Sequence, residues 1–366
     1  MPIELDLTKL SEEVPRVDSA TSRDIHIELL PSGRKLEAAS GQTILAASLG
    51  EGVNYPHGCK AGRCGNCKSR LVSGEVEMLV HSRFALSDDE RSAGLILACC
   101  AVPKTDLTVS WLGDETDVPS HPIIQSNAEV VSIVAATRDI RILQLRVLDG
   151  PMMFSAGQYA SVSLPGLPAR DYSMASSPSG ETLEFHVRLV PDGKVSPAMH
   201  GLVQGEMLKI EGPLGSAHLR HGHTGPVLAV AGGSGLAPIL SILGTLVELG
   251  MRQPVHVYVG ANSEHDIYGL ERLQKIADIH DDMTITTVAR FGEEGNGHRS
   301  GQVHEAVRTD LFDLKGWTCY AAGPPAMIDA LTETVLIAGL NRADFHADAF
   351  QTPMDLTAAP TLTEGS

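Results

Sequence analysis

The spacing of the cysteines constrains this chain more than any other feature of its sequence. Five of the six cysteines lie between Cys59 and Cys100, and three of them form the run Cys59-x4-Cys64-x2-Cys67. With a distant Cys99, this is the plant-type spacing of ligands to a [2Fe–2S] cluster. One tight loop then supplies three thiolates and a remote segment supplies the fourth. The sequence therefore predicts an iron–sulfur site built largely from one loop.

Zinc binding and a purely structural set of thiols are the alternatives to a cluster in this loop. Zinc sites more often show paired C-x2-C knuckles, whereas here an x4-x2 run stands in a glycine-rich loop. Glycines at 58, 62 and 65 let the backbone adopt positive φ and turn its amides toward the sulfurs. The fourth ligand is either Cys99 or Cys100. Cys319 lies far from this loop, and we expect it to be a small core residue.

The charge balance excludes several kinds of partner. The chain has 28 Lys and Arg against 45 Asp and Glu, which is a formal net charge of −17. Binding to nucleic-acid phosphates requires clustered basic side chains that displace counterions, and binding to anionic lipid requires a polybasic surface. We therefore expect neither a nucleic acid nor a membrane as partner.

The sequence also shows no membrane or secretion signal. Its longest apolar runs, such as 227–231 and 237–240, are far shorter than the roughly 20 residues that a membrane-spanning helix needs. The N-terminal segment is acidic and lacks the basic and apolar regions of a signal peptide. We therefore expect a cytoplasmic protein.

Hydrophobic patterning divides the chain into three modules. After the cysteine region, short strand-like segments at close intervals predict a small β-barrel. Beyond Pro226, apolar strand-like runs alternate with helical stretches, which is typical of βαβ units on a parallel sheet. The predicted organisation is an N-terminal extension at 1–23, a cluster domain at 24–112, a linker at 113–125, a barrel at 126–222, a nucleotide-binding domain at 223–352 and a tail at 353–366.

The barrel region contains two short motifs that matter because of their order. The residues RDYS at 170–173 follow one predicted strand, and GKVS at 193–196 follow a later one. Motifs of the form R-x-Y-S and G-x-x-S, placed ahead of a nucleotide domain, resemble those of the ferredoxin–NADP⁺ reductase superfamily. The resemblance implies a multidomain α+β and α/β fold. Its parts are a β-grasp-like [2Fe–2S] ferredoxin domain, a six-stranded antiparallel FAD-binding barrel and a C-terminal NAD-binding domain with a parallel sheet.

The same resemblance implies roles for individual residues. Arg170 would contact a flavin phosphate, Tyr172 would pack on the flavin, and Ser173 would face its reactive N5 atom. A strand would run beside the flavin and a following turn would bind the pyrophosphate, which favours FAD over FMN. These roles suit the residue types, because arginine binds phosphate bidentately and glycine-turn amides hold anions. The further residues assigned to the flavin in this way are His186, Val187, Arg188, Gly193, Lys194, Val195 and Ser196.

The start of the third module carries a turn for a dinucleotide. Gly232, Gly233, Ser234 and Gly235 stand between a predicted strand and an amphipathic helix. The third glycine of the dinucleotide fingerprint is replaced by Pro238, which suits the first turn of a helix. The form GGxGxAP resembles the reductase superfamily's own variant. No basic residue occurs at 260–264, where a 2′-phosphate would need one, so the expected coenzyme is NADH.

Two segments near the C-terminus complete the resemblance. Gly323, Pro324 and Pro325 resemble the family's CGPPxM segment, which shapes the nicotinamide pocket, although Ala322 stands in place of the usual cysteine. The residues FHADAF at 345–350 resemble the end of bacterial dioxygenase reductases, where a terminal aromatic lies near the flavin. This implies a catalytic role for Phe350 beside Tyr172 and Ser173, with Asp348 as a nearby polar contact.

The order of the three modules resembles that of the reductase components of bacterial aromatic-ring-hydroxylating dioxygenases, most of all the naphthalene dioxygenase reductase branch. It implies an enzyme that passes electrons from NADH to FAD, to the [2Fe–2S] cluster and on to a Rieske-type ferredoxin or terminal oxygenase. The segment LACCAVP also resembles the one that carries the distal cysteine in plant-type ferredoxins, and this resemblance implies Cys99 as the fourth ligand. The alternatives are a reductase of a di-iron multicomponent monooxygenase and a non-catalytic [2Fe–2S] carrier or redox sensor.

The acceptor has to dock on a chain of strongly negative charge. A local basic or apolar patch is therefore needed, and the cluster loop contains Lys60 and Arg63. We expect the acceptor to bind near these two side chains.

Overall fold

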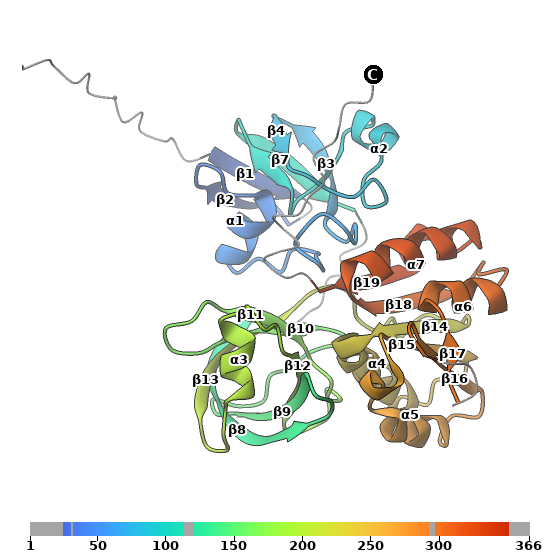
Figure 1. Ribbon diagram of the computed structural model, residues 1–366. Coiled ribbons are helices and arrows are strands. Elements are labelled where there is room, and N and C mark those ends of the chain that lie inside the picture. The colour runs from blue at the N-terminus through green and yellow to red at the C-terminus, as the bar shows by residue number, and fades with distance from the viewer. Residues whose placement is uncertain (1–24, 31, 113–120, 293–296, 351–366) are drawn as a thin grey trace, which may run out of the picture.

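The computed structural model describes residues 25–30, 32–112, 121–292 and 297–350. The expected N-terminal extension, residues 113–120 of the expected linker and the expected tail at 353–366 lie outside the described residues. Three lobes, each built on its own β-sheet, meet around the centre of the molecule (Figure 1). No helix among the described residues is long and apolar enough to cross a membrane.

The first lobe is a mixed sheet covered by a short helix. Its five strands have the order β2-β1-β7-β3-β5, with β1 and β7 parallel, and β4 and β6 form a separate pair. Alternate residues of β1 and β7, such as Ile27 and Val109, are fully buried, as expected for strands with one face on the core. The elements are β1 (Ile25–Leu30), β2 (Arg34–Ala38), α1 (Ile44–Gly50), β3 (Lys68–Ser73), β4 (Val76–Met78), α2 (Asp88–Ser92), β5 (Leu95–Leu97), β6 (Ala101–Pro103) and β7 (Leu107–Trp111).

The second lobe is the expected six-stranded antiparallel barrel. Its strand order is β11-β10-β13-β8-β9-β12, and a bridge between Met174 and Phe185 brings the two edge strands together. Phe185 and its apolar neighbours fill the interior. The elements are β8 (Ile124–Ala135), β9 (Ile140–Val147), β10 (Tyr159–Ser163), β11 (Arg170–Ser173), β12 (Leu183–Arg188), α3 (Val195–His200) and β13 (Met207–Leu214).

The third lobe is a parallel sheet of order β17-β16-β15-β14-β18-β19 with helices on its faces. Every residue of β14 is buried, because helices cover both faces of such a sheet and its central strand becomes a continuous apolar run. Ligands of sheets of this kind bind at the carboxyl ends of the strands. The elements are β14 (Val227–Gly232), η2 (Gly233–Gly235), α4 (Leu236–Glu248), β15 (Val255–Ala261), η3 (Glu264–Asp266), α5 (Leu270–Ala277), β16 (Met283–Ala289), β17 (Arg299–Ser300), α6 (Val303–Asp310), β18 (Thr318–Gly323), α7 (Pro325–Ile337), η4 (Arg342–Asp344) and β19 (Phe345–Ala349).

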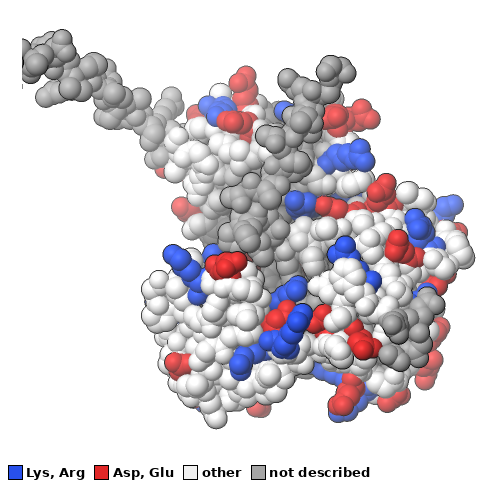
Figure 2. All heavy atoms as spheres, viewed as in Figure 1, with Lys and Arg blue, Asp and Glu red and all other residues white. Residues whose placement is uncertain are grey.

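Charged side chains of both signs are interspersed on the surface. On the face shown in Figure 2, Lys and Arg alternate with Asp and Glu, and no continuous basic surface is visible among the described residues.

Candidate functional site

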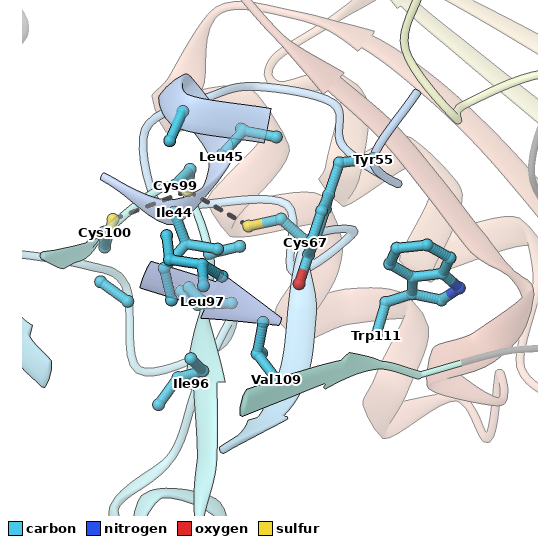
Figure 3. Close-up of a cluster of buried hydrophobic side chains, with 14 of the residues drawn as sticks. Ile44, Leu45, Tyr55, Cys67, Ile96, Leu97, Cys99, Cys100, Val109 and Trp111 are labelled. Atoms are coloured by element: carbon cyan, nitrogen blue, oxygen red, sulfur yellow. Dashed lines mark hydrogen bonds between the residues drawn. The ribbon is translucent and has the colours of Figure 1, made fainter. Parts of the chain in front are cut away.

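The cysteine loop arranges four thiols in two pairs. The Sγ atoms of Cys67 and Cys99 lie 3.2 Å apart (Figure 3), and Cys59 and Cys64 share a thiol hydrogen bond. The amide of Gly62 donates to Cys99 Sγ over 3.2 Å, and the amide of Cys64 donates to Cys59 Sγ over 3.4 Å. Backbone amides that donate hydrogen bonds to the ligand sulfurs tune the reduction potential of an iron–sulfur cluster.

This donor set suits a group with two metal atoms. Among the described residues, no three His, Cys, Asp or Glu side chains gather closely enough to hold a single metal ion, whereas two thiol pairs offer two ligands to each of two irons. The hydrogen bond from Cys67 to Cys99, together with burial, raises the pKa of the Cys67 thiol. Thiols of this kind become thiolates when a metal binds, so the residues present fit a [2Fe–2S] cluster.

Cys100 lies beside this set rather than within it. Its Sγ is 3.7 Å from Cys99 Sγ, a contact that Figure 3 marks with a dashed line. The same sulfur lies 3.7 Å from the carbonyl oxygen of Val80. It also touches the loop at Gly62, where an added Cβ would come within 2.6 Å of Cys100 Sγ. Gly62 has φ +70°, so both the backbone and the space require glycine there.

The basic residues of the loop face the other two modules. Lys60 Nζ lies 2.9 Å from Asp171 Oδ2 in β11, and Arg63 Nη1 lies 2.7 Å from Asp329 Oδ2 in α7. Both side chains are thus engaged in ion pairs within the chain while remaining partly exposed, and the expectation that an acceptor docks near Lys60 and Arg63 stays a prediction. The sequence analysis does not predict the ion pair of Asp171 with Lys60. Two signals could have suggested it: the acidic residue within the RDYS motif and the basic residues of the cluster loop.

A buried histidine joins the loop to the barrel. The Nε2 atom of His57 lies 2.8 Å from the hydroxyl of Tyr159 in β10, and its Nδ1 lies 2.6 Å from the carbonyl oxygen of Tyr55. Both the amide and the hydroxyl of Ser216 donate to the carbonyl oxygen of His57. Burial lowers the pKa of His57 to about 4, so the ring is neutral at physiological pH.

The strand that carries the RDYS motif divides its side chains between two faces. Side chains alternate along a strand, so Arg170 and Tyr172 lie on one face and Asp171 and Ser173 on the other. Arg170 donates to the neighbouring carbonyl of Ala169 over 2.8 Å, and Tyr172 packs at the edge of the barrel core. Burial raises the pKa of Tyr172 to about 12, so its hydroxyl stays protonated.

The opposite face of this strand meets the third module. The hydroxyl of Ser173 donates to Asp348 Oδ2 in β19 over 2.7 Å, and Ser173 lies opposite Tyr159 in the antiparallel ladder. Burial, with smaller contributions from Cys59 and Asp171, raises the pKa of Asp348 to about 6, against the opposing effect of the hydrogen bond from Ser173. The barrel, the cluster loop and the parallel sheet thus converge at this carboxyl.

For His186, Val187 and Arg188 in β12, the family resemblance implies backbone contacts with a flavin. His186 Nδ1 lies 2.7 Å from the hydroxyl of Tyr268, which in turn donates to the carbonyl of Gly233 over 3.5 Å. Val187 points into the barrel core and Arg188 pairs with Asp139 on the surface. His186 therefore links the barrel to the glycine turn of the third module.

The segment 193–196 forms a turn and the start of α3. Ser196 Oγ accepts from the amide of Val190 over 2.9 Å, and an added Cβ at Gly193 would lie 3.1 Å from the carbonyl oxygen of Val190. Val195 is buried, whereas Lys194 is exposed. The turn is therefore anchored to the end of β12, with its lysine facing solvent.

The two glycine segments of the third module pack against each other at the carboxyl ends of β14 and β18. An added Cβ at Gly235 would lie 2.0 Å from the carbonyl oxygen of Ala322, and one at Gly232 would lie 2.5 Å from Met327 Sδ. Helix α4 begins after Gly235 with no side-chain cap, although the Leu236 amide already donates to the carbonyl oxygen of Gly233. The N-terminus of a helix at a glycine turn is a position that suits an anion. Pro324 and Pro325 begin α7, with Ser234 in the turn opposite.

Phe350 belongs to the same corner. Its amide donates to the carbonyl oxygen of Gly323 over 2.9 Å, directly after β19. The half-buried Phe350 is thus held next to the Gly-Pro-Pro turn and two residues from Asp348.

A basic residue lies beside the segment 260–264, which itself contains none. The amides of Arg290 and Phe291 donate to the carbonyls of Ala261 and Asn262 over 2.9 and 2.8 Å. The guanidinium of Arg290 stacks over the ring of Phe291, which is 72% exposed. The signal that could have found this pair is the Arg-Phe that follows the next strand along the chain.

The pH dependence of stability tests the environment of Asp348. The unfolded chain ionises this carboxyl near its ordinary pKa, whereas the folded chain holds the proton until about pH 6, so its contribution to stability falls as pH rises between these values. Asp348→Asn removes this loss. Relative to wild type, we expect the variant to gain up to about 3 kcal/mol of unfolding free energy between pH 4 and pH 7.5, measured by chemical denaturation.

Asp281→Asn is the matched control, because the side chain of Asp281 is 92% exposed. It should show no gain that depends on pH. An equal difference between Asp348→Asn and wild type at both pH values would contradict the assigned environment.

Comparison with known proteins agrees with this architecture. Family models match a 2Fe-2S iron-sulfur cluster binding domain over residues 27–104, an oxidoreductase FAD-binding domain over 127–219 and an oxidoreductase NAD-binding domain over 229–333. These three domains lie on the mixed sheet, the barrel and the parallel sheet.

Whole-chain relatives extend the comparison beyond the single domains. The ferredoxin–NAD(P)⁺ reductase component of the naphthalene 1,2-dioxygenase system of Pseudomonas putida is 36% identical over 88% of this chain and 98% of its own. The reductase component of phenol 2-monooxygenase from a Pseudomonas strain is 34% identical over 90% of this chain and 95% of its own. The crystal structure of a cytochrome P450 reductase of Amycolatopsis superimposes with a TM-score of 0.73, 32% identity, and 89% and 98% coverage.

These coverages and identities extend over all three modules, so the similarity concerns the whole arrangement and not one domain. The chain belongs to the family of iron–sulfur flavoprotein reductases that form the reductase components of oxygenase systems and pass electrons from a nicotinamide coenzyme through FAD to a [2Fe–2S] cluster.

Proposed function

We propose that this chain is the NADH-dependent reductase of an aromatic-ring dioxygenase system, delivering single electrons from its cluster to a Rieske-type ferredoxin or terminal oxygenase. The observation that carries the proposal is the convergence of the cluster loop, Ser173 and Asp348 at the junction of the three modules. When bound, FAD would accept one hydride, which carries two electrons, and release those electrons one at a time, which is chemistry that the cofactor itself supplies.

Four cysteines hold the cluster in this proposal. Cys59 and Cys64 would bind one iron, and Cys67 and Cys99 the other, because the thiols are paired in that way. Cys100 would remain a neighbouring free thiol, since its sulfur lies 3.7 Å from Cys99 Sγ, farther than the 3.2 Å between the Sγ atoms of Cys67 and Cys99. The amide donors along the loop would stabilise the thiolates.

The barrel would hold the flavin through residues of β11 and the turn before α3. The guanidinium of Arg170 and the amides at 193–196 are suited to the two phosphates of FAD, and Tyr172 offers an apolar ring beside them. The Ser173 hydroxyl, whose proton is donated to Asp348, presents its oxygen as an acceptor toward the redox site. Asp348 thereby fixes the orientation of that hydroxyl.

The third module would position the coenzyme by its two glycine segments. The uncapped start of α4 suits the pyrophosphate, and the Gly323-Pro324-Pro325 turn, with Phe350 held beside it, would shape the space for the nicotinamide. Such positioning of two reactants carries most of the rate of a hydride transfer, so no proton-transferring side chain is required.

The acceptor would dock on the outer face of the segment that covers the cluster loop. The segment 79–86 covers the loop from outside: Ser82 N donates to Gly62 O, and Leu79 N donates to Cys100 O. Leu79 is 45% and Val80 72% exposed, and 79–86 contain Arg83 but no acidic residue. An apolar centre with a basic rim suits an acidic protein surface.

A second acceptor class has a specific observation in its favour. The similarity to the phenol 2-monooxygenase reductase component extends over 90% of this chain, so a di-iron monooxygenase remains an alternative acceptor. Family membership argues against the non-catalytic carrier or sensor. Turnover with purified acceptors of both classes separates the two remaining systems.

An anaerobic NADH titration of the holoprotein tests the electron chain and its ligands. We expect bleaching of the flavin band followed by the EPR signal of a reduced [2Fe–2S] cluster. Cys99→Ser should abolish or replace that signal because it removes a thiolate, whereas Cys100→Ser should keep it. The assignment fails if Cys100→Ser loses the signal and Cys99→Ser retains it, and the proposed function fails if wild type shows no flavin response.

Coenzyme preference tests the strand ends at 260–264 and 290–291. We expect wild type to prefer NADH in kcat/KM. Arg290→Ala should lower kcat/KM for NADPH by about tenfold and change that for NADH less, because only the 2′-phosphate needs the cation. Arg252→Ala, an exposed arginine at the other end of β15, is the control. An equal fall for both coenzymes would overturn this role of Arg290.

The docking surface is tested by Val80→Asp. A charge in an apolar interface that faces an acidic partner should raise KM for a Rieske-type ferredoxin about tenfold and leave NADH–ferricyanide turnover unchanged. Val134→Asp, at an exposed position of the barrel, should leave both unchanged. An unaltered KM for the ferredoxin in Val80→Asp would show that the acceptor binds elsewhere.

A further inference from the structure

One arginine of the nucleotide-binding module reaches into the cluster loop. Arg342, in η4 between α7 and β19, donates from Nη2 to the carbonyl oxygen of Cys64 over 2.6 Å. The same nitrogen packs on Gly65, where an added Cβ would lie 2.7 Å away. Gly65 has φ +79°, so this close approach depends on glycine. The guanidinium thus lies against the backbone that carries two of the paired cysteines.

This guanidinium has no dedicated counter-charge among the described residues. Its Nη1 atom is buried without a hydrogen-bond partner. Glu90 acts on it through space, but that carboxylate is paired with Lys68 and accepts from the amide of Ser87. Asp329, the carboxylate of the preceding helix, is paired with Arg63.

A cation held in this way is costly unless a negative charge lies nearby. Burial lowers the pKa of Arg342, while Cys64, Glu90 and Cys59 raise it. The ring of Phe345, 5.4 Å from the guanidinium carbon, adds a weak cation–π contact. The remaining charge that can compensate Arg342 is therefore that of the cluster loop itself.

The charge on a [2Fe–2S] cluster with four thiolates becomes more negative on reduction. Two ferric ions, two sulfides and four thiolates sum to two negative charges, and one electron converts one ferric ion to ferrous and brings the sum to three. A fixed cation nearby stabilises the reduced form more than the oxidised form. Net charge and hydrogen bonding near the cluster are among the determinants of its potential.

We propose that Arg342 is a positioning residue that raises the reduction potential of the cluster by supplying a counter-charge from the nucleotide-binding module. The inference rests on the proposed function, since it requires a [2Fe–2S] cluster in the loop. Arg342 and Cys64 are 278 positions apart in the chain, so the potential depends on how the first and third modules are docked. Electron flow from the flavin to the cluster is then favoured only in the assembled molecule.

Three substitutions separate charge from hydrogen bonding at this position. Arg342→Gln removes the charge but keeps an amide donor for the Cys64 carbonyl, Arg342→Met removes both, and Arg342→Lys keeps the charge. Arg91→Gln is the control, because it removes an equal charge from an exposed position of α2, where solvent and salt screen it. Each variant is studied as holoprotein carrying FAD and cluster.

The measurement is an anaerobic redox titration of the cluster, followed by its EPR signal. We expect the equilibrium constant for one-electron reduction to fall about tenfold in Arg342→Gln and Arg342→Met, which is a shift of about −59 mV, and to stay near wild type in Arg342→Lys and Arg91→Gln. The shift should persist at high salt. The rate of flavin reduction by NADH should not change.

Two results would overturn the inference. If Arg342→Gln and Arg342→Met keep the wild-type potential, the guanidinium only ties the loop to the third module. If the reduction potential of the cluster falls as far in Arg342→Lys as in Arg342→Gln, the geometry of the guanidinium and not its charge sets the potential. Absence of a cluster signal in wild type would instead be a failure of the proposed function, so the two are distinguishable.

Discussion

The enclosure of one loop between two modules is the constraint on which the rest of this structure depends. The cluster loop is held to the barrel by the buried contact between His57 and Tyr159, and to the parallel sheet by Arg342 and the carbonyl of Cys64. Because polar groups lose their water when enclosed in this way, each must find a partner. The partners come from modules far apart in the chain, so the loop orders all three lobes around itself.

The charges at this junction are of two kinds. The first kind consists of ion pairs in which each charge neutralises its partner, and the four side chains remain partly exposed. These pairs are Lys60 with Asp171 and Arg63 with Asp329. Such pairs contribute more to orientation than to stability. Asp348 and Arg342 are different, since neither has a charged partner that neutralises it among the described residues. Groups of this kind concentrate where a reaction changes the local charge, which is the case for a site that takes up electrons.

Much of the fold could be predicted because its signals are local. The cysteine spacing, the alternating strands of the barrel and the strand–glycine–helix start at 227–248 each lie within a short window, and the fold class is confirmed. The contacts of the site could not be predicted in the same way. Ser173 and Asp348 are 175 positions apart, and no local sequence pattern predicts that β11 and β19 lie next to each other. The position of Arg290 could not be predicted for the same reason, because only the pairing of β16 with β15 brings Arg290 beside the segment 260–264.

The sequence by itself determined which chemistry each module offers: thiols in a glycine-rich loop, an arginine and glycines for phosphates, and a turn at the end of a buried strand. Spacing and periodicity are sufficient for this because they act over a few residues. Only the tertiary structure decided which faces meet. It paired Lys60 and Arg63 with carboxylates of the other two modules, set Cys100 next to the paired thiols and placed the Arg342 cation beside the cluster loop. These outcomes depend on how the modules dock. A polar group that becomes buried there needs a hydrogen-bond or charge partner, and that partner comes from a distant part of the chain, so the local sequence does not reveal it.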